Sequence, residues 1–242
     1  MKSKTFKFLK KTLIIVVIVM FLLVMGLGIY STGSYAPLPE MEEAIEGLDL
    51  SEVTYEENIY KISYTVEEPL MNIIFVPGGL VTPDSYKYLA ASLAKEGYNV
   101  TISKAIYNLA IFTPNKPNKY LDKNLENVII GHSLGGVVSS MVASGNEDIS
   151  KVILLGSYPI KDLSDKETLL ITAEHDDGMD PEKFDESLKY VNDDNIIFNI
   201  IGGNHAQFGW YGPQKGDGEA EISTIIQQDI VVSKILEFLN EE

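Results

Sequence analysis

The stretch Val128-Ile129-Ile130-Gly131-His132-Ser133-Leu134-Gly135-Gly136 predicts the centre of the fold. It is an apolar run rich in β-branched residues that ends at the pattern Gly-x-Ser-x-Gly and continues into small and apolar residues of helical character. That order is typical of a strand, a sharp turn that lifts a serine hydroxyl, and a helix whose first free N–H groups face it. The pattern taken alone is a weak signal, because small residues recur by chance in loops.

Strands and helices are expected to alternate on both sides of this stretch. We predict strands at 70–76, 98–103, 127–131, 151–156, 168–173 and 196–201, one or two edge strands within 53–65, and helices at 86–96, 135–144, 182–191 and 219–239. Residues 108–122 read as a loop, and 41–50 as a short helix or an extended arm. This order predicts an α/β fold, a mostly parallel sheet with helices on both faces. Functional residues of such sheets lie at the carboxyl ends of the strands.

The N-terminus predicts a membrane segment. Five lysines precede an unbroken apolar run at 13–29, which is long enough to cross a bilayer as a helix. The lysines place the N-terminus on the cytoplasmic side. A cleaved signal peptide is the alternative, with Ser34-Tyr35-Ala36 as a poor cleavage site. The predicted parts are a basic leader at 1–11, a transmembrane signal anchor at 12–30, a linker at 31–50 and an extracytoplasmic α/β domain at 51–242.

Composition narrows the chemistry and the partners. The chain has no cysteine, which excludes disulfides and thiol chemistry, and all 19 basic residues are lysines. Five of them lie in residues 1–11, so 14 lysines face 35 acidic residues in the rest of the chain, a net charge of −21. A surface so acidic argues against nucleic acid and against polyanionic substrates.

A serine nucleophile needs a base, and the chain has three histidines. His132 lies inside the turn beside Ser133, so we expect it to be structural or to form a wall of the site. His175 is a possible substrate contact or a plain solvent-facing residue. His205 follows the last predicted strand on the Gly-rich loop Gly202-Gly203-Asn204-His205. We therefore predict that His205 is the general base.

The base needs an acid to hold its tautomer. Asp176 lies three residues past the end of a predicted strand, with Asp177 and Asp180 as substitutes. Acidic loop residues are ordinary in so acidic a chain. The order Ser133, Asp176, His205 is nevertheless the chain order of an α/β-hydrolase triad.

The developing oxyanion needs two backbone donors. One should be the N–H of Leu134, directly after the serine. The other should come from Pro77-Gly78-Gly79-Leu80, where glycine lets the backbone approach closely. We predict that Gly79 supplies this second N–H, with Leu80 as the alternative. An ordinary tight turn between strand and helix would also use these glycines.

From residue 70 to residue 239 the chain resembles α/β-hydrolases, and more narrowly the bacterial "α/β-hydrolase fold-5" group, related to dienelactone hydrolases and small esterases. The likeness is carried by Phe75-Val76-Pro77-Gly78-Gly79, Gly131-His132-Ser133-Leu134-Gly135-Gly136 and Gly203-Asn204-His205-Ala206-Gln207-Phe208-Gly209, followed by Trp210-Tyr211-Gly212 and Gly216-Asp217-Gly218. Two departures matter. Pro77 replaces the histidine common in His-Gly oxyanion loops, and Ser133 stands where dienelactone hydrolases use a cysteine. Their lactone substrate is therefore not carried over.

The spacing between the strands at 151–156 and 168–173 leaves no room for a large cap domain. The walls of the site must then come from the loop at 108–122 and from Phe208, Trp210 and Tyr211. We predict that Trp210, the only tryptophan, contacts the substrate. Simple packing of the loop is an equal alternative.

These features predict a membrane-anchored serine hydrolase that cleaves carboxylic esters outside the cell through an acyl-enzyme. The expected substrate is a small-molecule ester, neutral or weakly polar because the chain has no arginine to clamp a carboxylate. The mechanism requires no cofactor and no metal, and we expect none. An acyltransferase or amidase of cell-envelope material would use the same acyl-enzyme. A catalytically silent binding module is the non-enzymatic alternative.

Overall fold

The computed structural model describes residues 2–241, and the side chains of residues 9–241. Met1, the first residue of the predicted leader, lies outside the described residues. The chain forms two units, which divide between Ser34 and Tyr35. The first unit contains one long helix, α1 (Lys2–Ser31). Its part Leu9–Ser31 is long and apolar enough to cross a membrane, and a signal sequence near an N-terminus has the same properties.

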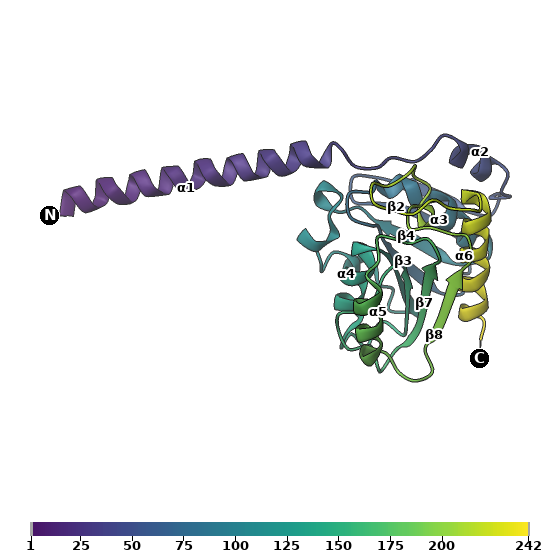
Figure 1. The fold of residues 1–242 in the computed structure, drawn as a ribbon. Helices are drawn as coiled ribbons and strands as arrows, with labels where there is room; N and C mark the ends of the chain where they lie inside the picture. The colour runs from purple at the N-terminus through teal and green to yellow at the C-terminus, as the bar shows by residue number, and fades with distance from the viewer. Residues whose placement is uncertain (1, 242) are drawn as a thin grey trace. The chain divides into compact units, whose positions relative to one another are not determined.

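An eight-stranded sheet forms the centre of the second unit (Figure 1). Its strands are β1 (Thr54–Glu57), β2 (Lys61–Thr65), β3 (Asn72–Val76), β4 (Asn99–Ser103), β5 (Asn127–His132), β6 (Lys151–Leu155), β7 (Glu167–Ala173) and β8 (Ile196–Ile200). They lie in the order β1-β2-β4-β3-β5-β6-β7-β8. The pairs β1–β2 and β2–β4 are antiparallel, and every other pair is parallel. The predicted α/β fold with a mostly parallel sheet is confirmed.

Helices cover both faces of the sheet because the central strands are apolar on both faces. Along β5, Val128 and Ile130 belong to the core cluster that includes α3 (Lys87–Lys95) and α6 (Thr224–Leu239). Ile129, between them, belongs to the cluster that includes α4 (Leu134–Ala143) and α5 (Pro181–Ser187). Figure 1 shows α4 and α5 on one side of the strands and α6 on the other.

Several connections between the strands and helices contain short 3-10 helices. They are η1 (Pro83–Tyr86), η2 (Ile106–Asn108), η3 (Ala110–Phe112), η4 (Pro117–Tyr120), η5 (Leu188–Tyr190) and η6 (Ala206–Phe208). Between β6 and β7, residues 156–166 form neither a helix nor a strand. The connection is therefore too short and too irregular to form a cap over the sheet.

The last helix begins later than predicted. The sequence pattern favoured a helix from residue 219, but α6 begins at Thr224. The Gly218 N–H donates to the His175 carbonyl at 3.2 Å, and the Glu221 N–H donates to the Gly202 carbonyl at 2.7 Å. Because these N–H groups bind loops at the carboxyl ends of β7 and β8, residues 218–222 run along those loops and do not begin the helix.

Most of the segment 31–50, predicted as a linker, lies within the second unit. The second unit begins at Tyr35, and α2 (Glu40–Glu46) packs on α3. Met41 of α2 is fully buried beside Tyr88 and Trp210. Residues 35–50 therefore belong to the folded unit, because their apolar side chains bury against it.

The first turn of α4 lies against the end of β3. A Cβ atom on Gly135 would overlap the carbonyl oxygens of Val76 and Pro77 and lie 2.8 Å from the Val76 carbonyl carbon. All of these neighbours are backbone atoms, which cannot rotate away. Only glycine fits at this position.

We therefore expect Gly135→Ala to destabilise the domain by about 2 kcal/mol, or roughly 4–8 °C in Tm, measured by thermal unfolding. Gly212→Ala is the matched control, since its Cβ would meet only the Leu38 Cδ2 atom at 3.4 Å. A melting temperature for Gly135→Ala equal to that of the control would contradict the close approach.

Candidate active site

Ser133 lies at the sharp turn between β5 and α4. Its backbone has φ 52° and ψ −123°, a region that non-glycine residues rarely adopt. Such a conformation costs about 1–3 kcal/mol and persists only where neighbours hold it. The Ser133 N–H donates to the Leu155 carbonyl at 3.0 Å, and the Ser157 hydroxyl donates to the Ser133 carbonyl at 2.7 Å. The end of β6 thus holds the strained serine from both sides.

The structure brings His205 and Asp176 together. Nδ1 of His205 lies 2.8 Å from Oδ2 of Asp176, and the two residues are only 3% and 9% exposed. The other carboxylate oxygen, Oδ1, accepts the Gly178 N–H at 3.0 Å. A carboxylate at Nδ1 fixes the tautomer that leaves Nε2 free to accept a proton.

The two substitute aspartates have other environments. Asp177 is exposed. Asp180 caps the N-terminus of α5, where its side chain accepts the N–H groups of Glu182 and Lys183 at 3.1 and 3.3 Å. Of the three aspartates, only Asp176 contacts the imidazole.

The Asp–His pair adjoins the serine turn through the end of β6. Gly156 has φ 49°, and a Cβ atom there would lie 2.9 Å from Asp176 Oδ2 and 3.0 Å from His205 Nδ1. Its two neighbours in sequence are the residues that hold Ser133. In the described part of the chain no hydrogen bond joins Ser133 to His205, and catalytic hydrogen bonds often tighten only with substrate in place.

Asp217 holds the loop that carries His205. Its carboxylate accepts the N–H groups of His205 and Ala206 at 3.2 and 2.8 Å. Burial raises the pKa of Asp217, and these two N–H groups act against that shift. Asp217 lies in the motif Gly216-Asp217-Gly218, but the motif alone does not reveal this role.

His132 is fully buried beside the base. The Gly78 N–H donates to the Tyr86 hydroxyl at 3.0 Å, and that hydroxyl lies 2.8 Å from His132 Nδ1. Burial, and then the charge of nearby His205, lower the pKa of His132 well below its ordinary value. His132 is therefore a neutral acceptor for Tyr86, and its ring lies 4.6 Å from the ring of His205. No local sequence pattern marks Tyr86, because its partner His132 lies 46 residues away in the chain.

The two expected oxyanion donors lie close together. A Cβ atom on Gly79 would sit 2.9 Å from Leu134 Cδ2, so the loop after β3 touches the start of α4. In the described loops, neither the Gly79 N–H nor the Leu134 N–H donates to another backbone carbonyl. The N–H of Leu80, the reserve candidate, is already bound to the Asn108 carbonyl at 2.8 Å. Gly79 and Leu134 remain the pair available for an oxyanion.

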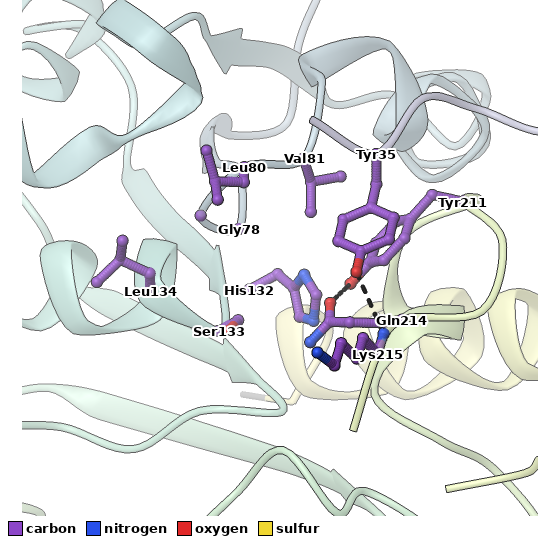
Figure 2. A pocket seen from close by; sticks show the side chains of 11 residues that line it. Tyr35, Gly78, Leu80, Val81, His132, Ser133, Leu134, Tyr211, Gln214 and Lys215 are labelled. Carbon is purple, nitrogen blue, oxygen red and sulfur yellow. Dashed lines mark hydrogen bonds between the residues drawn. The ribbon is translucent and has the colours of Figure 1, made fainter. Parts of the chain in front are cut away.

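A cavity of about 260 Å³ opens in front of Ser133 (Figure 2). It is lined by Tyr35, Gly78, Gly79, Leu80, Val81, His132, Ser133, Leu134, Tyr211, Gln214 and Lys215. Figure 2 shows the rings of Tyr35 and Tyr211 side by side at its wall. Both expected oxyanion donors therefore face the same cavity as the serine.

Trp210, which the sequence placed at the substrate, is not among the lining residues. It is 4% exposed and packs edge-on against Tyr88, with ring centroids 4.9 Å apart. Its backbone N–H donates to the Ser85 carbonyl at 2.6 Å. The structure therefore places Tyr211, the next aromatic residue, at the cavity in its stead.

Comparison with known families decides the classification. The model of the alpha/beta hydrolase family matches residues 72–229, which include the serine turn, Asp176 and His205. The chain belongs to the alpha/beta hydrolase family. Comparison of this hydrolase with curated proteins found no match.

Solved structures resemble this hydrolase in fold. A predicted CIB-like hydrolase from Thermoplasma acidophilum is 15% identical, with a TM-score of 0.56 over 76% of this chain and 99% of that one. A soluble variant of monoglyceride lipase from Saccharomyces cerevisiae is 13% identical, with a TM-score of 0.57 over 78% and 94%. A ferulic acid esterase from Streptomyces cinnamoneus is 16% identical, with a TM-score of 0.57 over 71% and 67%. At these identities the likeness concerns the fold alone.

The buried, neutral His132 should make the domain less stable in mild acid. Below about pH 6.5 the unfolded chain protonates this histidine while the folded chain does not. The free energy of unfolding should therefore fall with pH, by up to about 1.4 kcal/mol per pH unit from this residue.

The measurement is urea unfolding at pH 7.5, 6.5 and 5.5 for the wild type and for His132→Asn, which lacks the titrating group. The variant should show the shallower dependence on pH. Equal slopes would mean that His132 binds a proton as readily in the folded chain as in the unfolded chain.

Proposed function

We propose that this hydrolase cleaves carboxylic esters through an acyl-enzyme, with Ser133 as nucleophile, His205 as base and Asp176 as the acid that orients the base. The observation that carries the proposal is the buried Asp176–His205 hydrogen bond of 2.8 Å, held against the strained serine by the end of β6. This arrangement of acid, base and nucleophile generates a serine nucleophile at neutral pH.

In the first half-reaction, His205 Nε2 takes the Ser133 proton while Oγ attacks the ester carbonyl carbon. The carbonyl oxygen becomes an oxyanion, and the N–H groups of Gly79 and Leu134 stabilise it. When the tetrahedral intermediate collapses, the imidazolium gives its proton to the departing alcohol. The serine is left as an ester of the acyl group.

The second half-reaction repeats these steps with water. His205 takes a proton from water, the resulting hydroxide attacks the acyl carbonyl, and the acid product leaves as Ser133 regains its proton. Asp176 faces the imidazolium and stabilises it in both halves. Every proton is moved by the side chains named here, and no step requires a cofactor or metal.

A small-molecule ester fits the proposed site best. The cavity of about 260 Å³ is modest, and its lining contains no acidic side chain and a single lysine, Lys215. Two of the fold relatives are a ferulic acid esterase and a monoglyceride lipase, which supports ester chemistry for this site. The proposed triad chemistry is the same whichever acid and alcohol form the ester.

We further propose that α1 anchors the domain in the cell membrane, with residues 1–11 cytoplasmic, 12–30 spanning and the catalytic unit outside. The length and apolar character of Leu9–Ser31 support the anchor, and the lysines before it support the orientation. Protease added to intact cells should digest the catalytic unit. Protection of that unit until the cells are lysed would contradict this topology.

Ser133→Ala should abolish turnover of p-nitrophenyl acetate and butyrate and prevent labelling by a fluorophosphonate probe, because both need the serine oxygen. Spectrophotometric rates and gel fluorescence measure the two effects. Ser164→Ala, at an exposed loop serine, is the matched control and should retain both. Labelling of Ser133→Ala at the wild-type level would disprove the nucleophile.

Asp176→Asn should lower kcat by about three to four orders of magnitude, because an amide stabilises the wrong imidazole tautomer and no longer balances the imidazolium. Asp177→Asn, at the exposed neighbour, should keep kcat within about twofold. Steady-state kinetics on the same ester decide between them. A larger loss for Asp177→Asn would reassign the acid.

A further inference from the structure

The segment directly after α1 pairs with the predicted oxyanion loop. The Tyr35 N–H donates to the Leu80 carbonyl, and the Thr82 N–H donates to the Tyr35 carbonyl, each at 2.8 Å. Tyr35 thus forms a one-residue parallel bridge with Val81. Leu80 has φ 57°, a costly conformation for a leucine, and it is held here between Tyr35 and the Asn108 carbonyl.

The same segment also holds the loop that follows the base. The Tyr35 hydroxyl accepts the Lys215 N–H at 3.2 Å, which Figure 2 shows as a dashed line. Its ring packs on Tyr211 with centroids 5.5 Å apart. Pro37 forms an antiparallel bridge with Tyr211, and the Leu38 N–H donates to the Trp210 carbonyl at 2.9 Å.

Tyr35 therefore contacts both loops that form the cavity. One loop carries Gly79, the proposed oxyanion donor, and the other begins at His205. Backbone donors stabilise an oxyanion only when they are held in place before the reaction, and a displacement of about 1 Å weakens catalysis strongly. A residue that binds both loops is placed to hold the proposed donor, Gly79, at a fixed distance from the proposed base, His205.

We propose that Tyr35 is a positioning residue of the active site, so that the segment joining α1 to the domain is part of the catalytic machinery and not a passive tether. This inference rests on the proposed ester hydrolysis for its kinetic consequence. Its structural consequence, the joining of the two loops by Tyr35, is independent of the reaction.

The proposal restricts how the chain can be processed. Cleavage after Ala36 would remove Tyr35 together with both of its backbone bonds to the oxyanion loop and its bond to Lys215. The active protein must therefore retain Tyr35, which favours an uncleaved anchor over a signal peptide cut at Ser34-Tyr35-Ala36.

Hydrogen exchange on the full-length chain in detergent micelles tests the joining of the loops without reference to activity. Tyr35→Phe removes only the hydroxyl, so the Lys215 amide should exchange about three- to tenfold faster and the Thr82 amide at the wild-type rate. Tyr35→Ala, which also removes the ring, should speed exchange at both amides. Tyr60→Ala, at an exposed tyrosine outside the cavity, should change neither.

Steady-state kinetics on p-nitrophenyl butyrate test the positioning role. Tyr35→Ala should lower kcat about tenfold or more with a smaller change in KM, while Tyr35→Phe recovers to within about threefold and Tyr60→Ala matches the wild type. Wild-type exchange and wild-type kcat in a folded Tyr35→Ala would overturn the proposal. Faster exchange with unchanged kcat would reduce Tyr35 to a structural contact and overturn its positioning role.

These outcomes are separate from a failure of the proposed function. If the wild type neither turns over esters nor reacts with the fluorophosphonate at Ser133, ester hydrolysis is disproved, and the exchange rates alone then decide whether Tyr35 joins the loops. Intact mass of the active protein from cells tests the processing consequence. An active chain that begins at Pro37 or later would overturn it.

Discussion

The close approach of α4 to the end of β3 is the constraint on which the site depends. Gly135 lies so near the backbone of Val76 and Pro77 that a methyl group cannot fit. This contact holds the first turn of α4 against the loop after β3 and forces Ser133, at the junction, into its left-handed conformation. It also brings Leu134 into contact with Gly79, so one packing contact positions the proposed nucleophile and the two proposed oxyanion donors.

A second constraint joins His205, the proposed base, to that turn. The end of β6 separates them: Leu155 and Ser157 bind the backbone of Ser133, while Gly156 lies against the Asp176–His205 pair. Parallel strands with all their carboxyl ends at one edge make this arrangement possible. Neutral His132, packed against the ring of His205, adds no competing positive charge beside the base.

The residues that the sequence nominates for the site are those that a local pattern marks. Ser133 lies in a spaced glycine motif, and His205 and Asp176 each follow an apolar strand, so strand order alone brought them to one edge. Tyr86, Asp217 and Tyr35 were not assigned roles, because each acts through a partner far away in sequence. Trp210 was assigned to the site because it lies near His205 in the chain, but its ring packs on Tyr88 of α3. The predicted start of α6 was too early, because N–H groups within residues 218–222 bind carbonyls of distant loops and not of a helix.

By itself the sequence determined the fold class, the serine turn, the candidates for the proposed triad and the apolar N-terminal helix, since apolar period, glycine spacing and strand order are properties of the local chain. Only the tertiary structure decided that Asp176 and not Asp180 meets the imidazole, that Leu80 is already bonded, and that Tyr35 reaches both loops of the cavity. The physical reason is that these choices depend on hydrogen-bond partners supplied by other segments, whose positions exist only after the sheet has formed.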